Sequence, residues 1–281
     1  MNSDPLAGAN SRIAASGSDL RRSLERRRPW GQAAVLLVLA LGGCTTTLRS
    51  PLQLDPAHVA GLTRFDAAPW ALVLAKHVNS EGRVDYPSLL AERAPLDRFV
   101  ALIETVGPRS RPELFPSRDA RLAYYLNAYN AFVVFNVLER WPLTSVYDDA
   151  LDFFVLTKFP LDGRELSLKE LEDEVVRPFG DPRVHFALNC ASVGCPRLPQ
   201  QPFAAEELQA QLTQETARFL GDPRNVSHSP RRIRLSEIFS WYEDDFAPDA
   251  VRWIAQAAPD LALPIEAEVE FAPYDWRLNR Q

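Results

Sequence analysis

The sequence predicts an α+β fold, a single domain in which a long buried central helix packs on a small mixed or antiparallel sheet. Residues 121–140 are apolar nearly all the way round a helix, and residues 183–198 alternate like a buried strand. Helical patterns come first and strand patterns mixed with helices follow, which is typical of α+β domains. About 220 residues from Phe65 onward suit one core, so we predict one domain over 65–281.

The first 43 residues have the pattern of a signal peptide. Five arginines between residues 21 and 28 precede a short apolar run over 33–41, and small residues follow it. The run is shorter than the roughly 20 residues that a membrane-spanning helix needs. Residues 1–43 are therefore predicted to be cleaved from the mature protein.

A cysteine stands at the end of this leader. Leu41-Gly42-Gly43-Cys44 resembles the lipobox of bacterial lipoproteins, whose cysteine becomes the lipidated first residue of the mature protein. The resemblance implies lipidation at Cys44 and a membrane partner reached through that lipid. Thr45 stands where an aspartate would indicate inner-membrane retention, so it favours an outer membrane lipoprotein facing the periplasm. An ordinary secretory signal with a chance cysteine is the alternative. Residues 44–64 are polar or proline-punctuated and are predicted to be a lipidated tether.

The charge of the mature chain excludes one class of partner. Without residues 1–43 the chain has 25 Lys and Arg against 34 Asp and Glu, a net charge of −9. A nucleic-acid-binding protein needs a basic surface that replaces phosphate counterions, so we expect no nucleic acid partner. The lipid, rather than surface charge, is the expected membrane anchor.

The first half of the domain is predicted to be helical. Amphipathic helices are expected from Pro69 and over 96–106, and Gly107-Pro108 stops the second one. Ser117 can cap the central helix, and Trp141-Pro142 ends it. A helix with so little polar surface is expected to lie in the core.

Three polar residues lie inside that central helix. Tyr124, Asn127 and Asn130 stand three residues apart, so they share one face. Buried amides lower stability unless they are paired, so each asparagine is expected to have a fixed partner. Either the asparagines tie the helix to neighbouring backbone, or they have a direct role at a site.

The second half mixes strands and helices. The expected elements are a strand over 153–159, a hairpin turn at Asp162-Gly163, a helix that a Ser167–Glu170 capping box begins and Pro178 ends, a helix over 205–220, a strand over 232–235, a helix that Ser236 begins and that includes Asp245, and a strand over 265–271 with one wet face.

The predicted strand over 183–198 carries the residues that favour chemistry. With Cys44 lipidated, Cys190 and Cys195 remain, and an even count in an oxidising compartment indicates a disulfide, structural or redox-labile. Either cysteine can instead be a thiol nucleophile with His185 as its base. On a regular strand His185 and Cys190 point to opposite faces, so that pair needs a bend near Asn189, whereas Cys195 lies beyond the turn.

Other roles are open for these side chains. A zinc site using His185, Cys190 and Cys195 would lack the usual fourth ligand, so no metal is predicted. His185 can also be a neutral core histidine. Asp245 is the candidate carboxylate that orients the imidazole, and its alternative is a helix-end acid paired with an arginine or a backbone donor.

The chain resembles a known family. The residues that carry the resemblance are Gly82-Arg83-Val84-Asp85-Tyr86, Asn127-Ala128-Tyr129-Asn130, Val184-His185-Phe186-Ala187-Leu188 with Cys190, Gly194-Cys195-Pro196, Trp241-Tyr242 with Asp245-Phe246, and Tyr274-Asp275-Trp276-Arg277-Leu278-Asn279. In this order they resemble bacterial proteins of the domain of unknown function 547. The resemblance covers about Phe65 to Asn279 and implies a match over the whole fold without naming an activity. The family pattern differs at Tyr124-Tyr125, Ala128 and Arg277, which bears mainly on packing.

Two functions from different classes follow from these residues. The first is a lipid-anchored, periplasm-facing hydrolase or acyl transferase. It would use Cys190 or Cys195 as nucleophile, His185 as base and Asp245 to orient it, with Asn127 or Asn130 donating to an oxyanion. The second is a non-catalytic binding or structural lipoprotein with a Cys190–Cys195 disulfide. Neither requires a cofactor, and the sequence identifies no small-molecule or peptide ligand.

Overall fold

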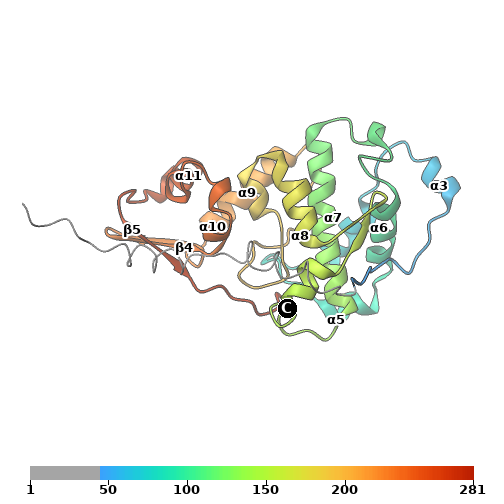
Figure 1. The fold of residues 1–281 in the computed structure, drawn as a ribbon, viewed down its shortest axis with the longest axis horizontal. Helices are drawn as coiled ribbons and strands as arrows, with labels where there is room; N and C mark the ends of the chain where they lie inside the picture. The colour runs from blue at the N-terminus through green and yellow to red at the C-terminus, as the bar shows by residue number, and fades with distance from the viewer. Residues whose placement is uncertain (1–44) are drawn as a thin grey trace, which may run out of the picture. The chain divides into compact units, whose positions relative to one another are not determined.

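Helix α7 (Arg118–Glu139) is the centre of the fold in the computed structural model, which describes residues 45–281 (Figure 1). The hydroxyl of Ser117 caps it by accepting the backbone N–H of Ala120 at 3.0 Å. Every residue from Leu126 to Leu138 is buried. The central buried helix is therefore confirmed. The predicted leader and Cys44 lie outside the described residues.

Further helices pack around α7 and share its core. They are α4 (Ala68–His77), α5 (Tyr86–Ala91), α6 (Ala94–Thr105), η1 (Pro112–Leu114), α8 (Leu168–Glu170), the π-helical η3 (Leu171–Val176), η4 (Arg177–Phe179) and α9 (Leu208–Leu220). Figure 1 shows α6 and α8 beside α7, and η3 and α9 also contact it. The capping box predicted for α8 is confirmed, because the Ser167 hydroxyl accepts the Glu170 N–H while the Glu170 carboxylate accepts the Ser167 N–H.

A two-stranded hairpin lies against this helical core. Strands β1 (Phe159–Leu161) and β2 (Arg164–Leu166) pair antiparallel around the predicted Asp162-Gly163 turn. The Phe159 ring stacks on Phe132 of α7 at 4.8 Å. The strand predicted over 153–159 is wrong for most of its length, because Asp152–Leu156 (η2) is a π-helical turn. Arg140 binds both Asp152 and Thr157 and closes that turn.

A three-stranded mixed sheet belongs to a second, smaller core. Its strands are β3 (Val226–Ser229), β4 (Arg232–Ser236) and β5 (Glu268–Ala272), and α10 (Ile238–Trp241), η6 (Glu243–Asp245), α11 (Ala250–Ala257) and η7 (Pro259–Leu261) accompany them. β4 pairs antiparallel with β3 and parallel with β5. Val269 and Phe271 of β5 are 39% and 37% exposed, so the apolar face of this edge strand is not covered by the described residues. Both cores belong to one unit, Gly43–Gln281, and the α+β fold is confirmed.

The strand predicted over 183–198 does not form. Pro182–Phe186 (η5) is a 3₁₀ helix, and an irregular loop follows it. The Asp181 carboxylate accepts the Arg183 N–H, and Pro182 stands in the first turn, where its missing N–H costs nothing. Residues 184–189 are all buried, so their apolar pattern reflects full burial rather than a strand with two faces.

Residues 45–64, expected to be a tether, lie along the domain. Leu48 and Lys158 are linked by a backbone hydrogen bond, and Lys158 donates to the Thr46 carbonyl. The short helix α3 (Pro56–Ala60) follows, and Arg111 donates to two carbonyls of this segment. Four apolar side chains of the segment pack against the main core, namely Leu48, Leu54, Val59 and Leu62.

The segment 274–281 joins distant parts of the chain. Asn279 accepts from Val84 N–H through its carbonyl, and its own N–H donates to Ala191. The Tyr86 hydroxyl donates to the Asn279 side chain at 2.7 Å. The loop after η5 is therefore held between residues from both ends of the domain. Within residues 45–281, no helix has the length and apolar character that crossing a membrane requires.

Candidate functional site

The loop over 187–196 is fixed by asparagine side chains. The Asn130 amide donates to the Ala187 carbonyl at 2.9 Å and accepts the Asn189 N–H at 2.8 Å. Asn189 in turn accepts the Ala191 N–H and donates to the Pro196 carbonyl. Both asparagines are buried, so these bonds satisfy polar groups that would otherwise lower stability.

Asn127 makes the same kind of bond elsewhere. Its amide donates to the Phe203 carbonyl at 2.8 Å and accepts the Phe203 N–H at 2.9 Å. Asn127 and Asn130 therefore tie α7 to neighbouring backbone, the first of the two interpretations. One N–H of each amide donates to a backbone carbonyl and each Oδ1 accepts a backbone N–H, so both side chains are fixed in position.

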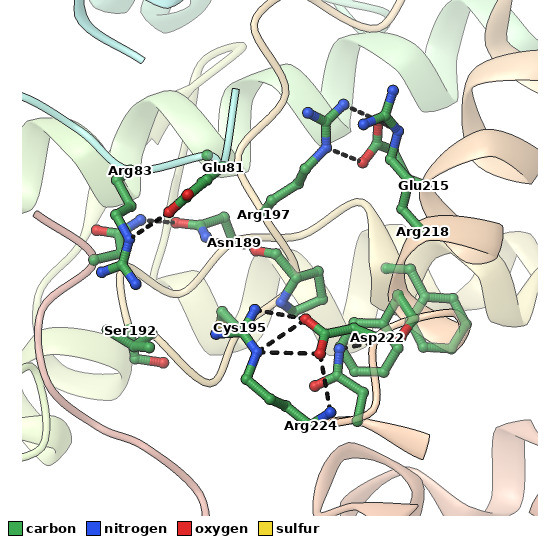
Figure 2. Close-up of a pocket in the computed structure, with 17 residues that line it drawn as sticks. Glu81, Arg83, Asn189, Ser192, Cys195, Arg197, Glu215, Arg218, Asp222 and Arg224 are labelled. Carbon is green, nitrogen blue, oxygen red and sulfur yellow. Dashed lines mark hydrogen bonds and ion pairs between the residues drawn. The ribbon is translucent and has the colours of Figure 1, made fainter. Parts of the chain in front are cut away.

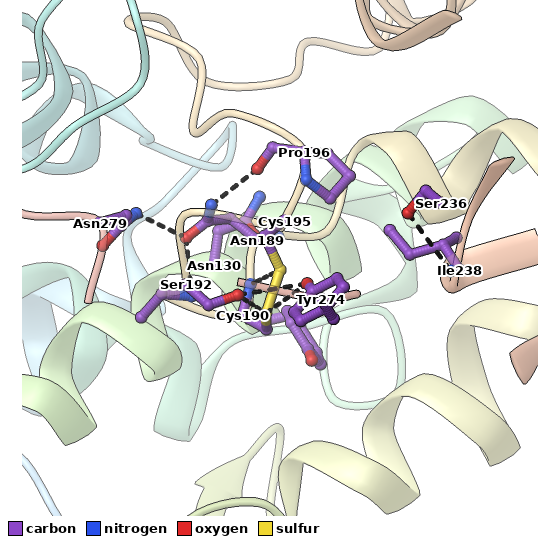
Figure 3. Close-up of a disulfide and its surroundings, with 12 residues drawn as sticks. Asn130, Asn189, Cys190, Ser192, Cys195, Pro196, Ser236, Ile238, Tyr274 and Asn279 are labelled. Atoms are coloured by element: carbon purple, nitrogen blue, oxygen red, sulfur yellow. Dashed lines mark hydrogen bonds between the residues drawn. A yellow bond between two sulfur atoms is a disulfide. The ribbon is translucent and has the colours of Figure 1, made fainter. Parts of the chain in front are cut away.

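Cys190 and Cys195 are joined by a disulfide, with Cα atoms 6.0 Å apart (Figure 3). Two hydroxyl groups surround the Cys190 sulfur: Ser192 Oγ at 3.0 Å and Tyr274 Oη at 3.3 Å. Gly194 lies against the Tyr274 ring, where an added Cβ would approach to 3.1 Å. A side chain at position 194 would push the loop away from Tyr274.

His185 lies at the end of η5 with its side chain almost fully buried. Its Nε2 is 2.7 Å from Asp245 Oδ2, so the predicted contact between these two residues is formed. The carboxylate can only accept, so Nε2 carries the hydrogen. Nδ1 faces a second carboxylate, Glu172, at 3.9 Å. The imidazole stacks on the Tyr242 ring at 4.0 Å.

Asp245 also binds an arginine, as its alternative role anticipated. Arg177 donates to both oxygens of Asp245, at 2.7 and 3.1 Å, and to Asp173 at 3.1 Å. The hydrogen bond from His185 and the contacts with Arg177 hold the pKa of Asp245 well below its usual range. Asp245 is therefore ionised at neutral pH.

Two tyrosines share the buried carboxylate Glu172. The Tyr129 hydroxyl is 3.4 Å from it, and Tyr242 lies beside it. Burial raises the pKa of Tyr129 and of Tyr242 well above the ordinary value, and the Glu172 carboxylate raises both further. Both hydroxyls therefore keep their protons at neutral pH and can donate to Glu172.

These contacts separate the histidine from the cysteines. The polar contacts of His185 lead to carboxylates, whereas the Cys190 sulfur contacts Cys195 and two hydroxyls. The zinc site considered for His185, Cys190 and Cys195 is not formed in this structure. The two sulfurs are joined in a disulfide, and only a thiolate is a zinc ligand. Among residues 45–281, no three His, Cys, Asp or Glu side chains gather as a metal site would require.

A pocket of about 220 Å³ lies beside this loop, and Asn189, Ser192 and Cys195 are among the residues that line it (Figure 2). Its charged lining consists of Arg83, Arg197, Arg218, Arg224, Glu81, Glu215 and Asp222. Arg197 is bidentate with Glu215, and Arg224 is bidentate with Asp222. Arg218 approaches Glu215 only to 3.9 Å, and its side chain is 47% exposed. The pocket therefore contains two arginines with bidentate acid partners and two, Arg83 and Arg218, that are held less tightly.

Gly82 forms a wall of the same pocket. Its φ of +77° is one that side chains rarely adopt, and a Cβ there would lie 2.5 Å from the Cβ of Arg197. The backbone of this turn can approach Arg197 only because residue 82 has no side chain.

The comparison with family models agrees with the motif resemblance over part of the chain. Residues 114–220 match the model described as "Protein of unknown function, DUF547". The DUF547 match includes α7, the hairpin, η5 and the disulfide loop, but it ends before Asp245 and Tyr274. No curated protein and no solved structure matches the chain.

The sequence indicated only some of these residues. His185, Asp245, Asn127, Asn130 and both cysteines were predicted. Glu172 and Arg177 were missed because a charged residue in a short helix resembles an exposed one. The remaining missed residues are Tyr129, Ser192, Tyr242, Tyr274 and the pocket arginines. The first four stand within or beside the family motifs quoted above, which was the available signal.

Proposed function

We propose that the chain is a lipid-anchored protein of the bacterial envelope, facing the periplasm, that binds a small anionic ligand without hydrolysing it. The leader and Cys44 support the anchor and the compartment. Binding without hydrolysis is supported mainly by one observation, the disulfide that joins both candidate nucleophiles.

The neighbours of the disulfide support the same proposal. A cysteine nucleophile needs a base or a cation beside a free thiolate. The two nitrogens of His185 face Asp245 and Glu172, and the amides of Asn127 and Asn130 are bonded to backbone. These groups stabilise the fold around the loop, which suits a binding domain.

The pocket beside Cys195 is the proposed ligand site. Arg197 donates to Glu215 and to the Ser80 carbonyl, so its orientation is set before a ligand arrives. Arg218 has the weakest ion pair of the four pocket arginines and is exposed enough to reach a ligand. A carboxylate or another small anion is the ligand chemistry that a guanidinium recognises best.

The first test is a thiol count on protein purified without reductant. We expect Cys190 and Cys195 to resist alkylation and the intact mass to be lower by two hydrogens. The Cys190→Ala/Cys195→Ala variant should fold with a free energy of unfolding lowered by about 2 kcal/mol, as expected for so short a closed loop. Reactive thiols whose alkylation rate depends on His185 would contradict the proposal and favour the hydrolase or acyl transferase.

A further inference from the structure

The two sulfur atoms of the disulfide have different surroundings. Cys195 lines the pocket together with the arginines, whereas Cys190 is not among the lining residues (Figure 2). The Cys190 sulfur lies against the hydroxyls of Ser192 and Tyr274, which are also 3.2 Å from each other (Figure 3). One cysteine of the disulfide, Cys195, is therefore part of the pocket lining, whereas the sulfur of the other lies beside the Tyr274 hydroxyl, which itself accepts the hydrogen of Ser192.

The surroundings of Cys190 suit a sulfur that leaves as thiolate. A hydroxyl that donates to a thiolate stabilises its charge, and exchange is faster when the leaving thiolate is stabilised. Burial raises the pKa of Tyr274, so this hydroxyl keeps its proton at neutral pH and can donate. The backbone N–H of Cys190 lies 2.8 Å from the other sulfur, that of Cys195, so it does not act on the leaving sulfur.

The pocket lining indicates what kind of molecule would reach Cys195. The apolar part of the lining is formed by Phe186, Phe219 and Pro196. Arg218 lies 3.9 Å from Glu215, and Arg83 has one contact with Glu81, so both guanidinium groups have donors left for a ligand. Such a lining fits a small molecule with a short apolar part and one or two carboxylates.

We propose that the Cys190–Cys195 disulfide undergoes thiol–disulfide exchange with a small carboxylate-bearing thiol held in this pocket. The inference rests on the proposed function because it uses the same pocket. The thiolate of the ligand attacks Cys195 Sγ and forms a new S–S bond as the Cys190–Cys195 bond breaks. The electron pair of the broken bond goes to Cys190 Sγ, which takes up the proton that the ligand thiol released. A second ligand thiol then displaces the first as a ligand disulfide and leaves both cysteines reduced.

The test compares two thiols on the full chain, purified with its disulfide intact. Reduced glutathione carries two carboxylates, and 2-mercaptoethanol carries none. The reactions are stopped with acid and analysed by intact mass and peptide mapping, and rates are corrected for the thiolate fraction of each reagent. We expect glutathione to be attached to Cys195, with Cys190 free, and to react faster than 2-mercaptoethanol.

Matched variants separate the parts of the proposal. Arg218→Ala should lower the glutathione preference roughly tenfold, because a charge-assisted hydrogen bond is lost. The control Arg231→Ala, an exposed arginine outside the pocket, should leave the preference unchanged. Tyr274→Phe should slow both thiols equally, since it removes a donor to the leaving sulfur.

Three results would overturn the exchange proposal: glutathione on Cys190, an equal preference in Arg218→Ala and Arg231→Ala, or no mixed disulfide in the folded protein. Titration with S-methylglutathione, which has no thiol, distinguishes the two proposals. Binding of this probe without any exchange by glutathione would leave the proposed function standing and reject the exchange. If neither ligand binds, both proposals fail.

Discussion

Asp245 accepts hydrogen bonds from two residues that lie far from it in the sequence, Arg177 and His185. Its pKa is lower in the folded protein than in the unfolded chain, where it is about 4. A carboxylate with a lowered folded pKa stabilises the fold above its unfolded pKa. That stabilisation is lost as the pH falls toward the folded pKa.

Replacement of Asp245 should therefore have a pH-dependent cost. We expect Asp245→Asn to lower the free energy of unfolding by roughly 1–3 kcal/mol at pH 7, because the hydrogen bonds from Arg177 and His185 lose their charged acceptor. The difference from the wild type should shrink as the pH is lowered from 4 to 2. Urea unfolding at several pH values measures it, with the exposed neighbour Asp244→Asn as the control. A deficit of equal size at pH 7 and pH 2 would show that the carboxylate charge is not the cause.

The same residues show what a sequence can predict of a site. Asn127 and Asn130 were identified because an amide in an apolar helix must be paired, and both are. Glu172 is buried by the packing of separate segments around His185, and no local pattern records that packing. A hydrogen bond between distant segments was therefore predictable only for a polar side chain that the sequence already placed in the core, where an unpaired group would lower stability.

Among the elements, helices with a clear cap or period were predicted well, and short irregular ones were not. Ser117 and Ser167 begin their helices as expected. The segments 153–159 and 183–198 were predicted as strands because full burial gives an apolar run in either conformation. Side chains outside these segments select the conformation. Arg140 binds Asp152 in the first segment, and Asn130 accepts the N–H of Asn189 in the second.

The segment 45–64 is predicted to stabilise the domain that it packs against. A chain that begins at Phe65 should be less stable than one that begins at Thr45 by about 2–4 kcal/mol, because partly buried leucine and valine contacts are lost. The melting temperature should fall by roughly 5–10 °C.

Arg111→Ala provides the control, since Arg111 binds carbonyls of Val59 and Leu62. It should cost about 1 kcal/mol more in the longer chain than in the shorter one. Equal melting temperatures for the two chains would contradict the docking.

For the whole molecule, we expect a lipid on Cys44 to hold the protein at the membrane. The wild-type protein should sediment with membranes, and Cys44→Ala should appear in the soluble periplasmic fraction, because the lipid is the proposed anchor and the mature chain is acidic. Thr45→Ala, which leaves the cysteine in place, should sediment like the wild type. Fractionation with detection of the attached lipid makes the measurement. Sedimentation of Cys44→Ala with membranes would reject the anchor.

The docking of residues 46–48 beside Lys158 changes what such an anchor would do. A tether of twenty residues would let the domain swing far from the bilayer, whereas Thr46 is already hydrogen-bonded to the domain. Only two peptide steps, about 7 Å of extended chain, separate Cys44 from that bond. A lipid at Cys44 would therefore hold the domain close to the bilayer, with little of the free reach that a twenty-residue tether would give.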